Sequence, residues 1–552
     1  MSHSHADLVL TGGPVHTVDP VLGRATSVAV RDGRIAAVGH DEVRELIGPG
    51  TEVVDLAGKM LLPGFQDAHV HPLVAGVELG QCHLAEAHEA GDYLRLVRAY
   101  ADGHPGAEWI TGGGWSLGAF PGGTPTAALL DGVVGDRPVF LPNRDHHGAW
   151  VNSRALELAG ITRDTPDPAD GRIERDADGN PTGMLQEGAL HLVDRLLPPV
   201  TAAERAAALL RAQGVLHSLG VTAWQDAIVG DYANMTDPVS AYHALIADGL
   251  LTARVVGALW WDRDRGAEQI PELVERRAAV SRGRFRATSV KIMQDGIAEN
   301  GTAALLGSYL TACGCASGNS GISFVDPAAL AKHVTELDAL GFQVHFHALG
   351  DRAVREALDA VAAARSVNGF RDTRHHLAHL QVVHPDDVAR FRVLGATATV
   401  QALWAAHERQ MDELTVPFLG PERAALQYPF GDLLRSGATL AVAAGSDWPV
   451  SSPDPFQALH VAVNRRTPDA PEGTPVFLPE QRVDLAAAIA AYTAGSAYAN
   501  HLDDTGTVTP GKLADLVVVD RDPFAGPPER IAATRVLQTF VGGVRVYAAP
   551  DA

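Results

Sequence analysis

Eight short apolar segments alternate with stretches of helical periodicity along the middle of this 552-residue chain. Strands that alternate with helices favour a parallel sheet, and eight such units can close into a (β/α)8 (TIM) barrel, an α/β fold. Because that fold places its chemistry at the carboxyl ends of the strands, polar residues there are candidates for function. The expected strands lie at residues 63–72, 221–229, 252–261, 287–296, 342–350, 375–383, 397–405 and 439–450.

The two ends of the chain differ from this middle part. Residues 1–62 and 503–552 contain short alternating segments with Asp-Gly and Gly-Gly turns, which are typical of small β domains. We expect both ends to form one composite β-sandwich and residues 63–502 to form the barrel. About 150 residues separate the first two barrel strands, whereas a βα unit needs roughly 30. We therefore expect an insertion at about residues 83–203 that covers the barrel mouth as a lid.

Histidines and a carboxylate follow several of the expected strands. His69 and His71 stand two residues apart on an extended segment, so their side chains point to the same side. His347, His379 and Asp447 lie at or near the ends of three later strands. A buried Asp is costly unless it is paired or bound to metal, and neutral imidazoles suit Zn²⁺. Together these residues predict a site for one or two divalent metal ions.

Lysine is rare in this chain, since only Lys59, Lys291, Lys332 and Lys512 occur. Lys291 lies in the apolar segment Ser-Val-Lys-Ile-Met of an expected barrel strand, where a charged ammonium would be costly. A neutral amine there could react with carbon dioxide, and the resulting carbamate could bridge two metal ions. The alternative is an unmodified Lys291 paired with Glu187 or Asp295.

Polar and aromatic residues of the insertion and the late loops are candidates for substrate binding. They are Trp115, His147, Glu187, Asp295 and Trp448. Tryptophans near the barrel mouth would favour an apolar or aromatic substituent on the substrate, and Asp295 would orient ligands or loops. The alternative for the insertion residues is that they pack against one another.

Composition excludes several classes of protein. The net charge of −22 disfavours a general binder of nucleic acid or of anionic membranes, which needs a basic surface. Three cysteines exclude a disulfide scaffold and a zinc site of four cysteines, and we interpret Cys313 and Cys315 as incidental. Neither an export signal nor an apolar stretch long enough to span a membrane is evident, so we expect a cytoplasmic protein. We also expect a small-molecule substrate and a homodimer.

Several longer motifs resemble the amidohydrolase superfamily of metal-dependent hydrolases over nearly the whole chain. They are PGFQDAHVHP, VKIMQDG, HFHALGDRAV, HHLAHLQVVHPDD, AAGSDWPV and TPGKLADLVVVDRDP. The inserted motifs GGGWSLGAFPGG, DHHGAWVNSRALELAGI and GMLQEGA resemble the amidohydrolase-3 branch, which includes N-substituted formamide deformylases. The resemblance implies metal ligation by His69, His71, His347, His379 and Asp447. It also places Lys291 at the position of the bridging carbamylated lysine.

The resemblance implies that a metal-activated water, with Asp447 as the group that accepts and returns a proton, hydrolyses an amide-type C–N bond. His147 or His379 would help to polarise the carbonyl. We expect an N-formyl or N-acyl amide with an apolar or aromatic substituent. Cyclic amides, carbamates and esters stay open as alternatives. Deamination is less favoured because Gly350 stands where deaminases of this superfamily commonly have a Glu, and a non-catalytic scaffold is least favoured.

Overall fold

A computed structural model describes residues 5–232, 236–437 and 442–550 of the chain. Eight parallel strands form one sheet in which each strand pairs with the next strand of the series. This confirms the predicted α/β barrel. Residues 439–441 of the last predicted strand lie outside the described residues. The strands are β6 (Phe65–Val70), β13 (Val221–Val229), β14 (Arg254–Trp260), β15 (Phe285–Met293), β16 (Gln343–Ala348), β17 (His376–His379), β18 (Thr397–Val400) and β19 (Val442–Ala444).

The first and last strands of this sheet meet where the chemistry was predicted. The backbone N–H of Asp447 donates to the carbonyl of His69 (2.8 Å), and that of His71 donates to the carbonyl of Trp448 (2.9 Å). These two bonds join the chain after β19 to the end of β6 and nearly close the barrel. Apolar residues such as Val290, Val344 and Leu377 are fully buried in the strands, as expected for a parallel sheet covered by helices.

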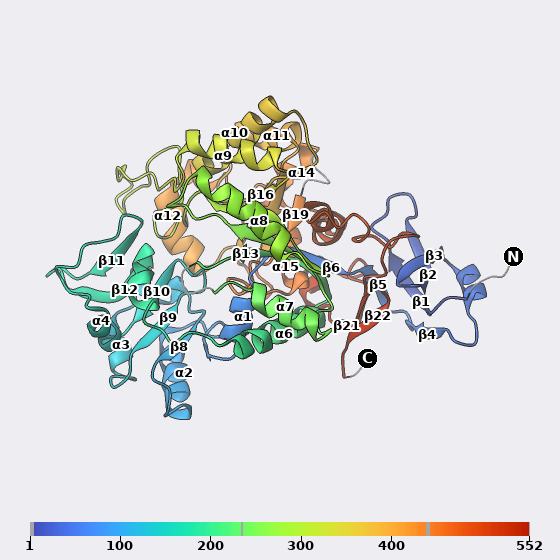
Figure 1. Cartoon of the computed structure of the whole chain (residues 1–552), viewed down its shortest axis with the longest axis horizontal. Coiled ribbons are helices and arrows are strands. Elements are labelled where there is room, and N and C mark those ends of the chain that lie inside the picture. Colours follow the sequence, from blue (N-terminus) through green and yellow to red (C-terminus); the bar gives the residue numbers. More distant parts are fainter. Residues whose placement is uncertain (1–4, 233–235, 438–441, 551–552) are drawn as a thin grey trace.

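Helices cover the outside of the barrel (Figure 1). Before β13, the helix α6 begins with a capping box, in which the Thr201 side chain accepts from the N–H of Glu204 and Glu204 accepts from that of Thr201. The other covering helices bury one apolar face each. The principal helices are α6 (Ala202–Ser218), α7 (Val239–Ala247), α8 (Ile270–Val280), α9 (Pro327–Ala339), α10 (Asp351–Asn368), α11 (Pro385–Leu394), α14 (Phe430–Arg435) and α15 (Pro455–Asn464).

A second eight-stranded sheet combines strands from both ends of the chain. Its order is β22-β21-β20-β5-β1-β2-β3, with β4 also paired to β1. The central contact is the antiparallel pair of β5 and β20. Whether this sheet forms a two-layer sandwich, and where the domain limits fall, stay predictions. The strands are β1 (Leu8–His16), β2 (Arg24–Arg31), β3 (Arg34–Gly39), β4 (Glu52–Asp55), β5 (Met60–Pro63), β20 (Leu516–Val519), β21 (Val536–Val541) and β22 (Val544–Ala548).

A third, six-stranded sheet lies between barrel strands β6 and β13 in sequence, with the order β11-β12-β10-β9-β8-β7. Figure 1 shows this sheet and the sheet of the chain ends on opposite sides of the barrel. Helices α1 (Pro72–Glu78) and α2 (Ala90–Gly103) belong to the same part of the chain. The strands are β7 (Cys82–His83), β8 (Ile110–Gly113), β9 (Val139–Pro142), β10 (Gly148–Val151), β11 (Gly171–Arg175) and β12 (Pro181–Glu187).

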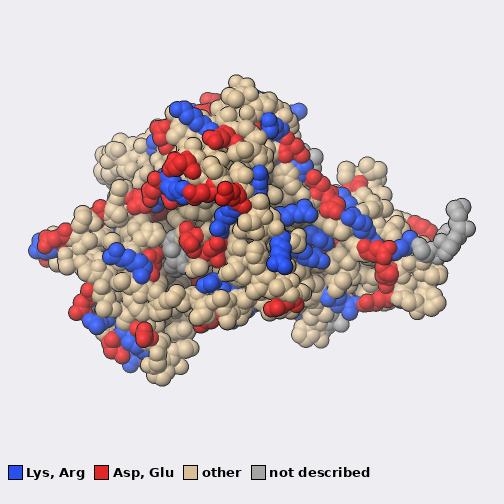
Figure 2. Space-filling view, in the orientation of Figure 1, with Lys and Arg blue, Asp and Glu red and all other residues tan. Residues whose placement is uncertain are grey.

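The surface carries charges of both signs. On the face drawn in Figure 2, acidic and basic side chains are interspersed among uncharged residues, which cover most of the area. Among the described residues, every helix is too short or too polar to cross a lipid bilayer.

Candidate active site

His69, His71 and Asp447 form a compact group at the point where the barrel closes. His69 and His71 come from the end of β6, and Asp447 follows β19. The Nε2 atoms of His69 and His71 lie 3.2 Å and 3.0 Å from Oδ1 of Asp447. One ligand atom from each of the three residues fits within 4.8 Å of the others, which is close enough to share one ion. The alternation predicted for the two histidines therefore brings both rings to the same carboxylate.

His347 and His379 complete this group from β16 and β17. The His379 ring lies 4.7 Å from the His69 ring and 4.5 Å from the His347 ring, measured between centroids. Nδ1 of His379 is 3.8 Å from Oδ2 of Asp447. His379 and Asp447 have positive φ angles of 82° and 56°, a region that non-glycine residues rarely adopt and that is common at functional sites.

Lys291 enters the same space from β15. Its side chain is 2% exposed, and burial lowers the pKa of its ammonium to about 7. Among the described residues, Lys291 forms no ion pair with Glu187 or Asp295, the partners considered as an alternative. A cavity of about 60 Å³ is lined by all six predicted metal ligands, namely His69, His71, Lys291, His347, His379 and Asp447.

Buried atoms without partners show how a metal ion would fit. Within the described part of the chain, Nδ1 of His379, Nδ1 of His71 and Oδ1 of Asp447 accept or donate no hydrogen bond although they are buried. Such atoms are rare in native proteins and call for an explanation. Burial lowers the pKa of His69 to about 3, so its ring is neutral. Burial alone would raise the pKa of Asp447, but His69 and its neighbours hold that pKa well below the usual range. Neutral imidazoles around an ionised carboxylate form a donor set that suits Zn²⁺.

Two residues behind the histidines orient their rings. Oδ1 of Asp295 lies 3.3 Å from Nδ1 of His347, and this carboxylate also accepts the backbone N–H groups of Ala304, Leu349 and Gly350. Asp295 is fully buried behind His347 and lines neither cavity, so the structure does not bring it to the substrate space as predicted for a substrate-binding residue. Nε2 of His345 is 2.8 Å from Nδ1 of His69.

Sequence reasoning missed His345 and Asp67. Asp67 accepts the backbone N–H groups of His69 and Ser446 and the Ser446 hydroxyl, which ties β6 to the chain after β19. Both residues stand two positions before a predicted ligand, in the patterns Asp-x-His and His-x-His. That spacing turns their side chains to the same face of the strand and could have identified them.

His147 and Glu187 form a buried pair beside the histidines. Nδ1 of His147 lies 2.9 Å from Oε2 of Glu187, and the Thr302 hydroxyl donates to Oε1 of Glu187 (2.7 Å). Burial alone would lower the pKa of His147, but Glu187 raises it to about 9. His147 lines both cavities, so a cationic imidazole faces the space beside the metal-ligand candidates.

A larger cavity of about 600 Å³ adjoins this group and has room for an organic substrate. Asp447, His347, His379, His147 and Trp448 are among its lining residues. The structure does not bring Trp115 to either cavity. Trp115 is fully buried in the insertion, where its ring N–H donates to the carbonyl of Leu141 (2.8 Å). Trp404, which was not predicted, lines the large cavity and stacks on His379 with a centroid distance of 5.3 Å.

A barrel with histidines and a carboxylate at the carboxyl ends of its strands defines a metal-dependent hydrolase, and comparison with known proteins agrees. The amidohydrolase family profile matches residues 52–547. The chain is 32% identical to Protein LONG AFTER FAR-RED 3 of Arabidopsis thaliana over 98% of this chain and 92% of that protein. It is 28% identical to the N-substituted formamide deformylase of Arthrobacter pascens over 98% of each chain.

Solved structures give the same result. A metal-dependent hydrolase from Pyrococcus horikoshii superimposes with a TM-score of 0.71 at 25% identity, covering 94% of this chain and 99% of that one. A second, from Pyrococcus furiosus, has a TM-score of 0.69 at the same identity and coverage. The chain belongs to the amidohydrolase family, and it is a hydrolytic enzyme that acts on carbon–nitrogen bonds.

Proposed function

We propose that this enzyme uses Zn²⁺ to hydrolyse an N-formyl or N-acyl amide of an organic amine. The observation that carries the proposal is that two cavities adjoin each other. A cavity of about 60 Å³ surrounded by six candidate ligands adjoins a cavity of about 600 Å³ with aromatic walls. The similarity to a deformylase of Arthrobacter pascens supports an amide as the substrate.

The ion would be held by His69, His71 and Asp447, with His347 and His379 beside them. When bound, it would supply Lewis acidity to the substrate carbonyl and would acidify a water molecule. Lys291 lies among these residues, and the lowered pKa of its side chain leaves a large neutral fraction near pH 7. A neutral amine can add carbon dioxide with loss of a proton. The proposal therefore includes a carbamate on Lys291, which would bridge two metal ions.

The chain's own residues supply the proton transfers. Asp447 is ionised, and a carboxylate that holds the ion through one oxygen can accept a proton from the attacking water on the other. The same carboxyl group can then donate that proton to the leaving amine nitrogen. His147, held as a cation by Glu187, can donate a hydrogen bond to the carbonyl oxygen as negative charge develops on it.

The direct test combines metal analysis with a substrate panel. The purified enzyme, its chelator-treated form and the zinc-reloaded form are assayed on N-formyl, N-acetyl and cyclic amides and on a matched ester. We expect activity on the open-chain amides that disappears on chelation and returns with zinc. Activity that survives complete removal of metal, or that is confined to the ester, contradicts the proposal.

The carbamate has a separate test. Lys291→Ala should reduce the number of bound metal ions per chain, because the bridging group is lost. Lys332→Ala, at an exposed position of helix α9, is the matched control and should leave the metal content unchanged. An unchanged metal content in Lys291→Ala would exclude the bridge.

A further inference from the structure

The large cavity has an acidic wall. Arg144 is the one Lys or Arg side chain among its described lining residues. Six carboxylates besides Asp447 line it, and they come from segments that are far apart in the sequence. They are Glu86, Asp145, Glu299, Glu408, Asp454 and Asp469.

Asp145 and Glu299 are two carboxylates of this wall, and of the two only Asp145 has cationic neighbours, the imidazoles of His146 and His147. In the described part of the chain, neither forms an ion pair with Lys or Arg. The hydroxyl of Thr415 donates to Glu299 (2.5 Å), and the backbone N–H of His147 donates to Asp145 (3.0 Å). Burial raises the pKa of both carboxyl groups, and the charge of Asp145 raises that of Glu299 further. Both side chains line the same cavity.

The candidate metal ligands mark the reacting end of this cavity. Nδ1 of His379 and Oδ1 of Asp447 belong to residues that are 2% and 5% exposed, and neither atom has a hydrogen bond among the described residues. Both residues line the cavity, so the bond to be cleaved must enter here. The acidic wall then surrounds the remainder of the substrate.

Aromatic rings form another part of the wall. Trp404, Tyr428 and Trp448 line the cavity, and Trp404 lies parallel to the His379 ring within 10°. Ring faces accept apolar chains and also attract organic cations. An alkyl or aryl group that carries an ammonium therefore matches both kinds of lining side chain.

We propose that the substrate is an amide with a second, protonated amine, such as a mono-N-formylated or mono-N-acylated diamine, whose ammonium is received by Asp145 and Glu299. This inference rests on the proposed amide hydrolysis and specifies its substrate class. It modifies the sequence-based expectation of a purely apolar or aromatic substituent, because the lining is acidic as well as aromatic.

The test compares three matched substrates with the zinc-loaded enzyme. They are a mono-N-acylated diaminoalkane, the N-alkyl amide of equal length, and the amide of equal length with a terminal carboxylate. Charge-assisted hydrogen bonds to a buried carboxylate predict a kcat/KM at least about tenfold higher for the ammonium substrate than for the neutral one. We expect the carboxylate substrate to be the poorest.

Variants of the carboxylates that line the cavity test whether the acidic wall causes the preference for the ammonium substrate. Glu299→Gln and Asp145→Asn should each reduce the preference for the ammonium substrate, and Glu299→Gln should leave kcat/KM for the neutral amide nearly unchanged. Glu336→Gln, at an exposed site on α9, should keep the preference. A neutral amide that is as good as the ammonium substrate, or a preference that persists in both cavity variants, overturns the inference.

Calorimetry separates this inference from the proposed function. The free diaminoalkane should bind to the zinc-loaded protein more tightly than a dicarboxylate of equal length, and Glu299→Gln should weaken that binding. If no amide is hydrolysed but the diamine binds in this way, the proposed function fails and the recognition of a cation by the wall stands. If the diamine does not bind, the inference fails even where amides are hydrolysed.

Discussion

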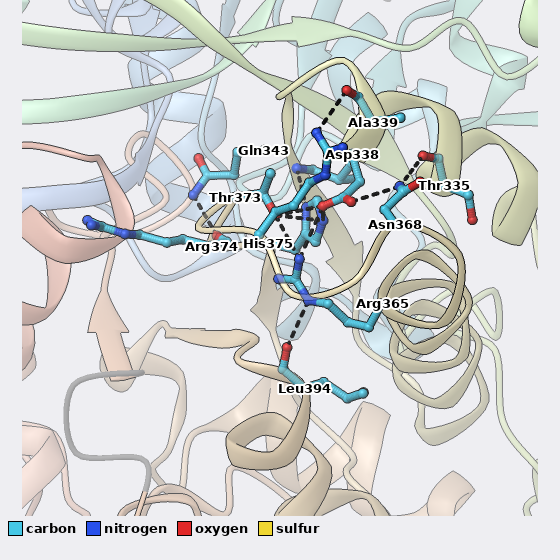
Figure 3. A network of polar contacts seen from close by, with 12 residues as sticks. Thr335, Asp338, Ala339, Gln343, Arg365, Asn368, Thr373, Arg374, His375 and Leu394 are labelled. Atoms are coloured by element: carbon cyan, nitrogen blue, oxygen red, sulfur yellow. Dashed lines mark hydrogen bonds and ion pairs between the residues drawn. The ribbon is translucent and has the colours of Figure 1, made fainter.

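The two ends of the barrel use buried Asp and His side chains in opposite ways. At the end where the strands begin, Oδ1 of Asp338 accepts from Nε2 of His375 (2.9 Å) and from the Thr373 hydroxyl (2.8 Å). Its Oδ2 accepts from the Asn368 amide (2.9 Å), and Nδ1 of His375 accepts from the N–H of Val344 (2.9 Å). Figure 3 shows these contacts converging from α9, α10 and the segment before β17. Both carboxylate oxygens of Asp338 and both ring nitrogens of His375 therefore have hydrogen-bond partners within the protein.

At the opposite end, Asp447 and His379 are equally buried, yet each has an atom without a hydrogen bond among the described residues. Leaving such atoms unpaired costs free energy of folding, which the protein tolerates where a ligand completes the bonding. The difference teaches that burial and residue type do not identify a site by themselves. Unsatisfied atoms that face a cavity distinguish the functional end from the structural one.

The largest expected effect comes from Asp447→Asn. An amide cannot accept the proton of the attacking water, so kcat should fall by about 10²–10⁴-fold. The metal content should fall as well, because a neutral amide is a weaker metal ligand than a carboxylate. Steady-state kinetics and metal analysis of the same preparation check this. Full activity of the Asn variant would contradict the role of Asp447.

The second-largest effect is expected on stability, at the structural end of the barrel, where the strands begin. Asp338→Asn removes the charge that pairs with the buried Arg365 guanidinium (3.2 Å) and should lower the free energy of unfolding by about 3 kcal/mol. The kcat/KM of the folded fraction should stay unchanged, because this network lies at the other end of the strands. A substantial loss of kcat/KM with normal stability would show that the two ends are not separate in function.

The sequence predicted the barrel well because its signal is local and repeated. Apolar runs that end in polar residues marked all eight strands, and the six predicted ligands all line one cavity because barrel strands bring their carboxyl ends together. The placement of Trp115 could not be predicted in this way. An irregular Gly-rich loop has no periodicity from which the direction of a side chain can be predicted. The Trp115 side chain is buried in the core of the insertion.

Trp404 illustrates a second limit. It follows β18 in a short 3-10 helix, so its position over His379 depends on how the chain leaves the barrel and not on strand alternation. The acidic wall is similar, since Asp145 and Glu299 line one cavity only through folding of distant segments. His345, in contrast, was within reach of the sequence, because it alternates with His347 on one strand.

His345 offers a smaller but more specific test of the functional end. A neutral ring at His345 that accepts from Nδ1–H of His69 leaves the lone pair on Nε2 of His69 free for a metal ion. Removal of such a supporting contact commonly lowers metal affinity by about 10–100-fold. We expect that loss for His345→Met, measured by chelator competition, and a smaller loss for His345→Gln, which can still accept the bond.

The control for His345 is another buried histidine, one that lines neither cavity. His217 is bonded to the carbonyl of Val221 and to the Thr252 side chain, and His217→Gln should leave the metal affinity unchanged. Equal losses of affinity in His345→Met and His345→Gln, or a loss in His217→Gln, would show that packing and not the hydrogen bond is responsible.

The smallest effect is the pH dependence of stability at the structural end. Burial alone would raise the pKa of Asp338, but the hydrogen bonds from His375, Asn368 and Thr373 hold it well below its usual range. A carboxyl group with a depressed pKa stabilises the fold above its unfolded value near pH 4, and this contribution is lost as the pH falls further. The difference in unfolding free energy between wild type and Asp338→Asn should therefore be constant from about pH 7 to pH 5 and shrink below about pH 4, with a slope of at most about 1.4 kcal/mol per pH unit for one proton. A difference that grows towards acid pH would mean that Asp338 is not ionised in the folded protein.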